Sequence, residues 1–116
     1  MKLREVAEAT GAKVICGERH LNDEVDSAFG SDMMSDVLAY VKPTTLVLTG
    51  MVNSHVIRTA DMLDIKCLLF VRGKCVTQEI IDSAQEREMV ILSTPMTMYE
   101  ACGRLYGTGL PACSKE

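Results

Sequence analysis

Three short apolar runs of the sequence are each followed by polar or charged residues of the kinds that bind ligands. The runs cover residues 46–49, 67–71 and 90–93. After them come hydroxyl, amide and imidazole groups and two cations, which together could hydrogen-bond or neutralise an anionic ligand. The candidate binding residues are Thr49, Gly50, Asn53, Ser54, His55, Arg72, Gly73, Lys74, Ser93, Thr94 and Thr97.

Two of these candidates, Arg72 and Lys74, flank Gly73 just before a predicted helix. A cation at a helix N-terminus meets the positive end of the helix dipole, so the position is unfavourable unless something offsets it. An anion bound between the two side chains would do so. The alternative is that both side chains extend into water. The pair is a stronger electrostatic indication of an anion site than the candidate residues at 49–55.

Several candidates also have a structural explanation as helix caps. Asn53 is a good N-cap residue, and Val52 and Ile57 are spaced as a hydrophobic staple around it. Thr77 can cap the next helix, and Thr97 begins a Thr-x-x-Glu capping-box pattern. We therefore expect these side chains to satisfy helix N–H groups whether or not a ligand binds.

Cys75 and His55 are the residues on which an enzyme would depend. Cys75 lies near a helix start beside two cations, a setting that can make a thiol reactive, although an inert thiol is the commoner case. His55 falls in the first turn of a predicted helix, where a neutral imidazole is favoured, and no catalytic partner for it is evident. The sequence lacks phosphate-loop, nucleophile-elbow and HExxH motifs. We therefore predict a protein that is not an enzyme.

Metal binding has little support in the sequence. Cys16 and His20 have a spacing that could supply two ligands, but a structural zinc site needs four and no second pair follows. We predict no metal site and no cofactor. The five cysteines form no close pairs, which indicates reduced thiols.

Repeated strand–helix units position the candidate residues. Each apolar run is too short for a helix and lacks the alternation of a strand with one wet face, so each is predicted to be a central strand covered on both sides. Amphipathic helices follow at 54–63, 78–87 and 98–106, the last with Tyr99, Cys102 and Leu105 facing inward. Such units build a parallel sheet, in which ligands bind beyond the carboxyl ends of the strands.

The N-terminal part adds further elements. A short helix is predicted before Gly11, which stands where a left-handed residue commonly ends a helix. Strands are predicted at 12–16 and 24–29. Ser31 is predicted to cap a helix over 31–41, whose apolar positions 33, 34, 37, 38 and 41 face the core.

Length and composition limit the classes of protein that fit. A chain of 116 residues fits one domain, which we place at residues 1–107, followed by an irregular tail at 108–116. The formal net charge of −4 and the lack of a basic run argue against nucleic-acid binding. No apolar stretch approaches the roughly 20 residues that span a bilayer, so we expect a cytoplasmic protein without a membrane segment.

Three stretches carry a family resemblance that extends over residues 2–107: "LREVAEATGAKVICGERHLNDEV", "VKPTTLVLTG" and "STPMTMYE". Together they resemble the DRTGG domain, whose fold is similar to the N-terminal domain of bacterial HPr kinase/phosphorylase. The resemblance implies a regulatory or dimer-forming domain, and hence a homodimer. The sequence departs from the family at "GMVNSH" and "VRGKC", where members often have Gly-Asp-Arg and Thr-Gly-Gly turns.

The leading hypothesis is a small single-domain α/β module, with a mostly parallel central sheet flanked by helices, that regulates by binding an anionic small molecule such as an adenine nucleotide. Stand-alone proteins resembling this one are associated with anaerobic hydrogenase gene neighbourhoods. A second hypothesis is therefore an accessory subunit that docks on a redox enzyme through the Met-rich helix 31–41 or the tail. A third is an enzyme that uses Cys75 or His55.

Overall fold

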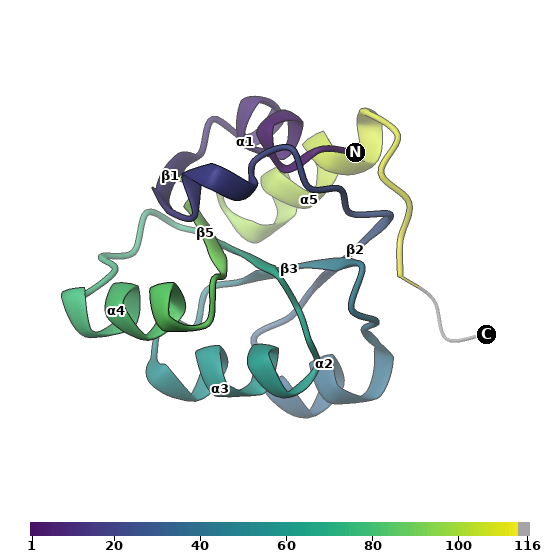
Figure 1. Ribbon diagram of the computed structural model, residues 1–116. Coiled ribbons are helices and arrows are strands. Elements are labelled where there is room, and N and C mark those ends of the chain that lie inside the picture. The colour runs from purple at the N-terminus through teal and green to yellow at the C-terminus, as the bar shows by residue number, and fades with distance from the viewer. Residues whose placement is uncertain (114–116) are drawn as a thin grey trace.

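Five strands form one sheet at the centre of the molecule, with helices on both faces (Figure 1). The computed structural model describes residues 1–113 of the chain. Its elements in chain order are α1 (Leu3–Thr10), β1 (Lys13–Cys16), a 3-10 helix (Glu18–His20), β2 (Ser27–Gly30), α2 (Met34–Tyr40), β3 (Thr45–Thr49), α3 (Ser54–Met62), β4 (Cys67–Phe70), α4 (Gln78–Glu86), β5 (Val90–Ser93) and α5 (Met98–Gly107).

The strands lie in the order β1-β5-β4-β3-β2. β2 pairs with β3, β3 with β4 and β4 with β5 in parallel, whereas β1 pairs antiparallel with β5 at one edge. The predicted small α/β fold with a mostly parallel sheet is therefore confirmed. Because β1 runs the other way, its first residue, Lys13, lies opposite Ser93 at the end of β5. The start of β1 thus meets the carboxyl ends of the parallel strands.

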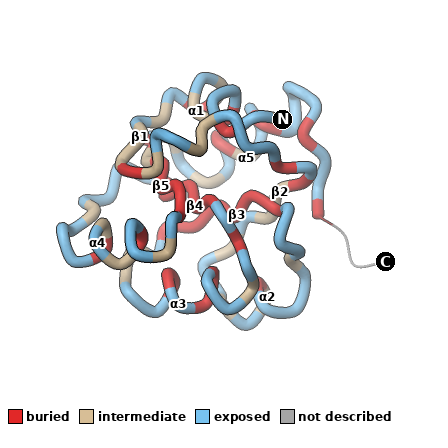
Figure 2. The backbone as a smooth tube through the Cα atoms, viewed as in Figure 1, coloured by how far each residue is buried: buried red, intermediate tan, exposed pale blue. Residues whose placement is uncertain are grey.

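Two hydrophobic clusters fill the spaces between the sheet and the helices. α1 and α5 cover one face of the sheet, and α2, α3 and α4 cover the other (Figure 1). Along β3, Leu46 and Leu48 belong to the first cluster and Val47 to the second. All three are fully buried, as predicted for a central strand covered on both sides (Figure 2). Burying each such side chain contributes about 1.5–3 kcal/mol.

Helix α2 differs from its prediction at both its start and its buried face. It begins after Met33 rather than after Ser31, whose hydroxyl accepts a hydrogen bond from the Met33 N–H at 3.0 Å and bends the chain before the helix. Val37 is buried, but Met33 and Leu38 are 60% and 48% exposed. The reason is that α2 follows the edge strand β2, where a two-turn helix covers only a narrow stripe of the sheet.

Tyr99 was predicted to face inward and is instead 91% exposed. The buried side chains of α5 are Ala101 and Leu105, which are four residues apart and therefore share one face of the helix. Tyr99 lies two residues before Ala101, close to the opposite face. The small side chain of Ala101 allows α5 to approach the sheet closely, and Cys102 is left half-buried.

The segment after α5 follows the outer edge of β2. Its backbone pairs with Ala28, whose N–H donates to the Pro111 carbonyl at 3.0 Å and whose carbonyl accepts from the Cys113 N–H at 2.9 Å. Leu110 and Cys113 are buried. Residues 108–113 of the predicted tail therefore pack on the domain, and residues 114–116 lie outside the described part of the chain.

None of the helices in residues 1–113 combines the length and the apolar character needed to cross a membrane.

Candidate functional site

The loops after β2, β3, β4 and β5, together with the start of β1, form what we call the carboxyl edge of the sheet. Two predicted candidates on this edge, Asn53 and Thr97, act as helix caps, and so does Thr77, which was predicted as a cap alone. Asn53 Oδ1 accepts from the Val56 N–H at 3.0 Å, and the hydroxyls of Thr77 and Thr97 accept from the first turns of α4 and α5 at 3.4 Å. The predicted N-caps are confirmed, so these oxygens already have partners in the fold. The capping box predicted at Thr97 is only half formed, because within residues 1–113 the Thr97 N–H makes no hydrogen bond to the Glu100 carboxylate that would complete it.

Two further candidates, Thr49 and Thr94, are fully buried and shape the loops. The Thr49 hydroxyl accepts from the Met51 N–H at 3.1 Å. The Thr94 hydroxyl donates to the Thr10 carbonyl at 2.6 Å and accepts from the Met96 N–H at 3.2 Å. Both side chains therefore hold the edge together from inside.

Asp32 is a residue of the carboxyl edge that the sequence analysis missed. Its Oδ1 accepts from the Gly50 N–H at 2.7 Å and from the Thr49 hydroxyl at 3.2 Å, and its Oδ2 lies 3.5 Å from Arg72 Nη2. The Gly50 N–H, the Thr49 hydroxyl and the Arg72 charge lower the pKa of this carboxyl. A signal was present in the sequence, since Asp32 follows a predicted strand just as the other candidates do.

Arg72 is held in place by both its side chain and its backbone. Its guanidinium lies over Gly50, where an added Cβ would overlap it. Its backbone has a left-handed φ of +68°, and its N–H donates to the Met96 carbonyl at 2.8 Å. The neighbouring Gly73 N–H donates to the Thr94 carbonyl at 2.9 Å. Arg72 therefore has a carboxylate partner within the chain, which offsets its unfavourable place before α4.

Lys74 lines a different part of the carboxyl edge, a hollow of about 490 Å³ between β1, α4 and the ends of β4 and β5. We call it the lysine hollow, because Lys13 and Lys74 both line it and no carboxylate does. Lys13 was not among the predicted residues. Neither lysine forms an ion pair within residues 1–113. The residues that line the hollow are Gly11, Lys13, Ile15, Gly73, Lys74, Val76, Ile81, Ser93 and Pro95.

The remaining candidates do not come together as a catalytic group in the described residues. Ser54 and His55 are exposed in the first turn of α3, and Cys75 is exposed after β4. No hydrogen bond or ion pair within residues 1–113 involves the side chain of His55 or of Cys75. Desolvation on burial raises the pKa of the Cys16, Cys67 and Cys102 thiols.

The possible metal ligands also lie apart. Cys16 Sγ donates to the Met89 carbonyl at 3.7 Å, whereas His20 lies beside Asp23 and Glu88 at 3.5 and 3.8 Å. Among residues 1–113, no group of three or more His, Cys, Asp or Glu side chains could hold a metal ion.

The fold and the carboxyl edge define a three-layer α/β domain with its polar loops where ligand-binding α/β domains place theirs. The family model of the DRTGG domain matches residues 5–107, and the chain belongs to this family. The resemblance found in the sequence is thereby confirmed. A comparison with curated protein sequences gives no significant match.

A similar solved structure is the crystal structure of the CBS and DRTGG domains of the regulatory region of Clostridium perfringens pyrophosphatase, complexed with the activator diadenosine tetraphosphate. It aligns with 99% of this chain, with a TM-score of 0.69 and 14% sequence identity. Our chain covers 50% of that longer chain. At this identity the likeness establishes a shared fold.

Proposed function

We propose that this protein is a non-catalytic regulatory module that binds an anionic small molecule, such as an adenine nucleotide, at the carboxyl edge of its sheet. The observation that carries the proposal is the lysine hollow. Lys13, Lys74 and Ser93 all line it, and Lys13 lies opposite Ser93 in the sheet. Its volume of about 490 Å³ falls in the range of small-molecule sites.

The charge of the hollow stands out against the rest of this acidic protein, whose formal net charge is −4. Three other surface hollows each contain carboxylates, which repel an anion. An anion is therefore favoured at the lysine hollow over these alternatives. Their carboxylates are those of Glu18 and Glu88 in the first, Asp23, Glu24 and Asp64 in the second, and Glu5 and Asp26 in the third.

The solved relative guides the choice of ligand to test. Its DRTGG domain belongs to a regulatory region that was crystallised with an adenine dinucleotide activator. This supports a regulatory role for the present chain and makes adenine nucleotides the first ligands to examine.

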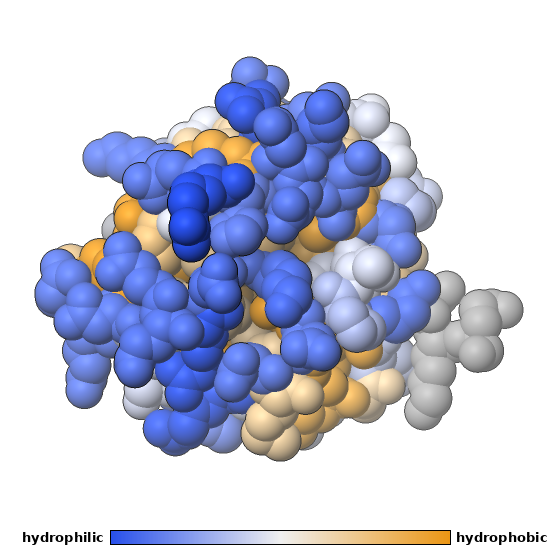
Figure 3. Space-filling view, in the orientation of Figure 1, coloured by the Kyte–Doolittle hydropathy of each residue, from blue (hydrophilic) through white to orange (hydrophobic). Residues whose placement is uncertain are grey.

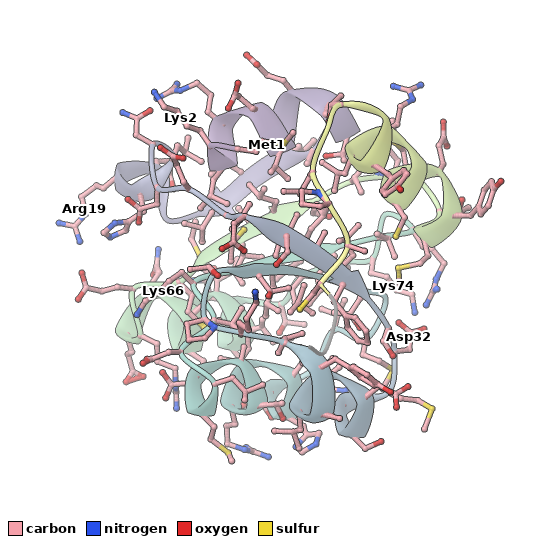
Figure 4. The ribbon with its side chains drawn as sticks, turned by 90° about the vertical axis from the view of Figure 1, so that its right-hand side faces the viewer. Met1, Lys2, Arg19, Asp32, Lys66 and Lys74 are labelled. Atoms are coloured by element: carbon pink, nitrogen blue, oxygen red, sulfur yellow. The ribbon has the colours of Figure 1, made fainter. Side chains whose placement is uncertain are left out.

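Thermal unfolding and calorimetry with AMP, ADP, ATP and diadenosine tetraphosphate test the proposal. A ligand that binds only the native state stabilises it by about 2.7 kcal/mol at 100 times its Kd, so the Tm should rise. Lys74→Gln should weaken binding. Lys66→Gln is the matched control, because Lys66 lies at the opposite edge of the molecule from Lys74, near Asp64 (Figure 4). The proposal fails if no nucleotide stabilises the protein, or if both variants weaken binding equally.

One observation favours a second candidate function, that of an accessory subunit docked on a redox enzyme. Met33 and Leu38 of the α2 region are exposed, and Figure 3 shows hydrophobic surface in the lower part of the molecule, where Figure 1 labels α2. Exposed apolar patches mark interaction sites. Anaerobic co-purification should then capture a redox enzyme with the wild-type protein and lose it with Leu38→Ser. Recovery of the protein alone would contradict this function.

A further inference from the structure

The lysine hollow has an apolar wall as well as its cations. Ile15, Val76 and Ile81 line it and are only half-buried. All three pack against the hydrophobic cluster under α2, α3 and α4, so the wall is the exposed margin of that core. Covering such a margin with a ligand would remove apolar surface from water, which favours binding.

The wall and the cations face the same space. Lys13 and Ile15 of β1 both line the hollow, and Ile15 lies at a β-bulge between Val14 and Cys16 that places it against the same cluster as Cys16. Ser93 lies opposite Lys13 on β5, and Lys74 reaches the hollow from the loop after β4. The lysine hollow is therefore built from three separate chain segments, and it has an apolar part and a cationic part.

Part of the backbone beside the hollow is already hydrogen-bonded within the fold. Strong phosphate sites commonly use a row of free N–H groups at a glycine-rich loop. Here the N–H groups of Arg72 and Gly73 already donate to the Met96 and Thr94 carbonyls. Lysines act on a phosphate as point charges without fixed geometry. A small inorganic anion would gain exposed charge interactions with the lysines and would leave the apolar wall uncovered.

We propose that the lysine hollow selects a phosphorylated molecule with a flat ring, of the nucleotide class, whose phosphate lies by Lys13 and Lys74 and whose base covers Ile15, Val76 and Ile81. This inference rests on the proposed function, because it concerns the same site. It adds that ring burial carries a large share of the affinity and that Lys13 is a ligand-binding residue.

Titration calorimetry with four compounds separates the two parts of the site. ADP has both the ring and the charge, pyrophosphate and ribose 5-phosphate have charge without the ring, and adenosine has the ring without charge. We expect ADP to bind at least about tenfold more tightly than each of the other three, because each of them lacks one of the two parts. A tenfold change corresponds to about 1.4 kcal/mol. If pyrophosphate binds as tightly as ADP, the inference is wrong and the proposed function stands. If none of the four binds, both fail.

Two variants assign the parts to residues. Lys13→Gln should weaken ADP and pyrophosphate alike, whereas Ile81→Ser should weaken ADP by about tenfold and leave pyrophosphate unchanged. The ratio of the two affinities for one variant does not depend on how much of that variant is folded. Val76→Ser provides a second test of the wall outside any helix. Equal losses for ADP and pyrophosphate in both wall variants would overturn the inference.

Discussion

At the scale of single residues, the carboxyl edge divides into side chains that hold the fold and side chains that remain available. Asp32 belongs to the first group, because it accepts hydrogen bonds from the Gly50 N–H and the Thr49 hydroxyl and pairs with Arg72. Lys74 belongs to the second. Only the available group can contribute charge to a ligand without breaking an existing contact.

Asp32→Asn should destabilise the protein by about 1 kcal/mol at neutral pH, because the amide keeps an oxygen for Gly50 but loses the charge that faces a half-exposed Arg72. The folded-state pKa of Asp32 is lowered, so its contribution is present above its ordinary value near 4 and is lost as the pH falls through the folded-state pKa. Urea unfolding at pH 7 and pH 3 measures this. The wild-type advantage over Asp32→Asn should shrink at pH 3.

The matched control is Glu8→Gln, at an exposed position of α1 whose side chain forms no hydrogen bond or ion pair in the described residues. Its unfolding free energy should stay within about 0.5 kcal/mol of the wild-type value. If the wild-type protein is more stable than Asp32→Asn by the same amount at both pH values, the Asp32 charge contributes nothing to stability.

Gly50→Ala tests the contact between Gly50 and the Arg72 guanidinium, which an added Cβ would displace. We expect a loss of about 1 kcal/mol, because the displaced guanidinium no longer pairs with Asp32. In an Arg72→Ala background the same substitution should cost much less, since the group in its way is gone. Urea unfolding of the two single variants and the double variant gives the coupling. Additive effects would contradict the contact.

At the scale of elements, predictions from the sequence succeed where the information is local. The runs that became β3, β4 and β5 are continuously apolar because both faces of these strands are covered, and this pattern is visible in four or five residues. The bounds of α2 were wrong because the edge of the sheet decides how much of that helix is buried. No local pattern in the sequence records this.

The lysine hollow shows the same limit. Gly73, Lys74 and Ser93 were predicted, since they follow apolar runs directly. Lys13 was missed because it enters the site through the antiparallel pairing of β1 with β5, two segments far apart in the sequence. Long-range pairing of this kind leaves no signal in the residues around Lys13.

Gly103→Ala tests whether a residue that favours the helix stabilises α5. Gly103 is exposed inside the helix, and an added Cβ would meet no atom within 4 Å. Alanine restricts the unfolded chain and favours the helix, so the substitution should stabilise the protein by about 0.5–1 kcal/mol. Gly17→Ala is the opposite control, because φ is +90° there and a Cβ would meet the Val90 backbone. Thermal unfolding should give a higher Tm than the wild type for Gly103→Ala and a lower Tm for Gly17→Ala.

At the scale of the whole molecule, the two sides of the domain differ in character. The lysine hollow is cationic, whereas the groove between β2, α5 and residues 110–112 is lined almost entirely by apolar side chains and has a volume of about 370 Å³. Tyr99 and Tyr106 stand exposed at its border. A two-fold axis would bring the same groove of two copies together, since such an interface uses one patch twice.

The homodimer predicted from the family resemblance should therefore use this groove, because large exposed apolar patches mark interfaces. Analytical ultracentrifugation should give twice the chain mass of 12.7 kDa for the wild type. A double variant with Tyr99→Ser and Tyr106→Ser should dissociate at least tenfold more readily, since both exposed rings lose their contacts. Met62→Ser, which removes an exposed apolar side chain from α3 on the other side of the sheet, should leave the dimer unchanged. A monomer at every concentration would exclude the dimer, and a dimer that the double variant leaves intact would move the interface away from the groove.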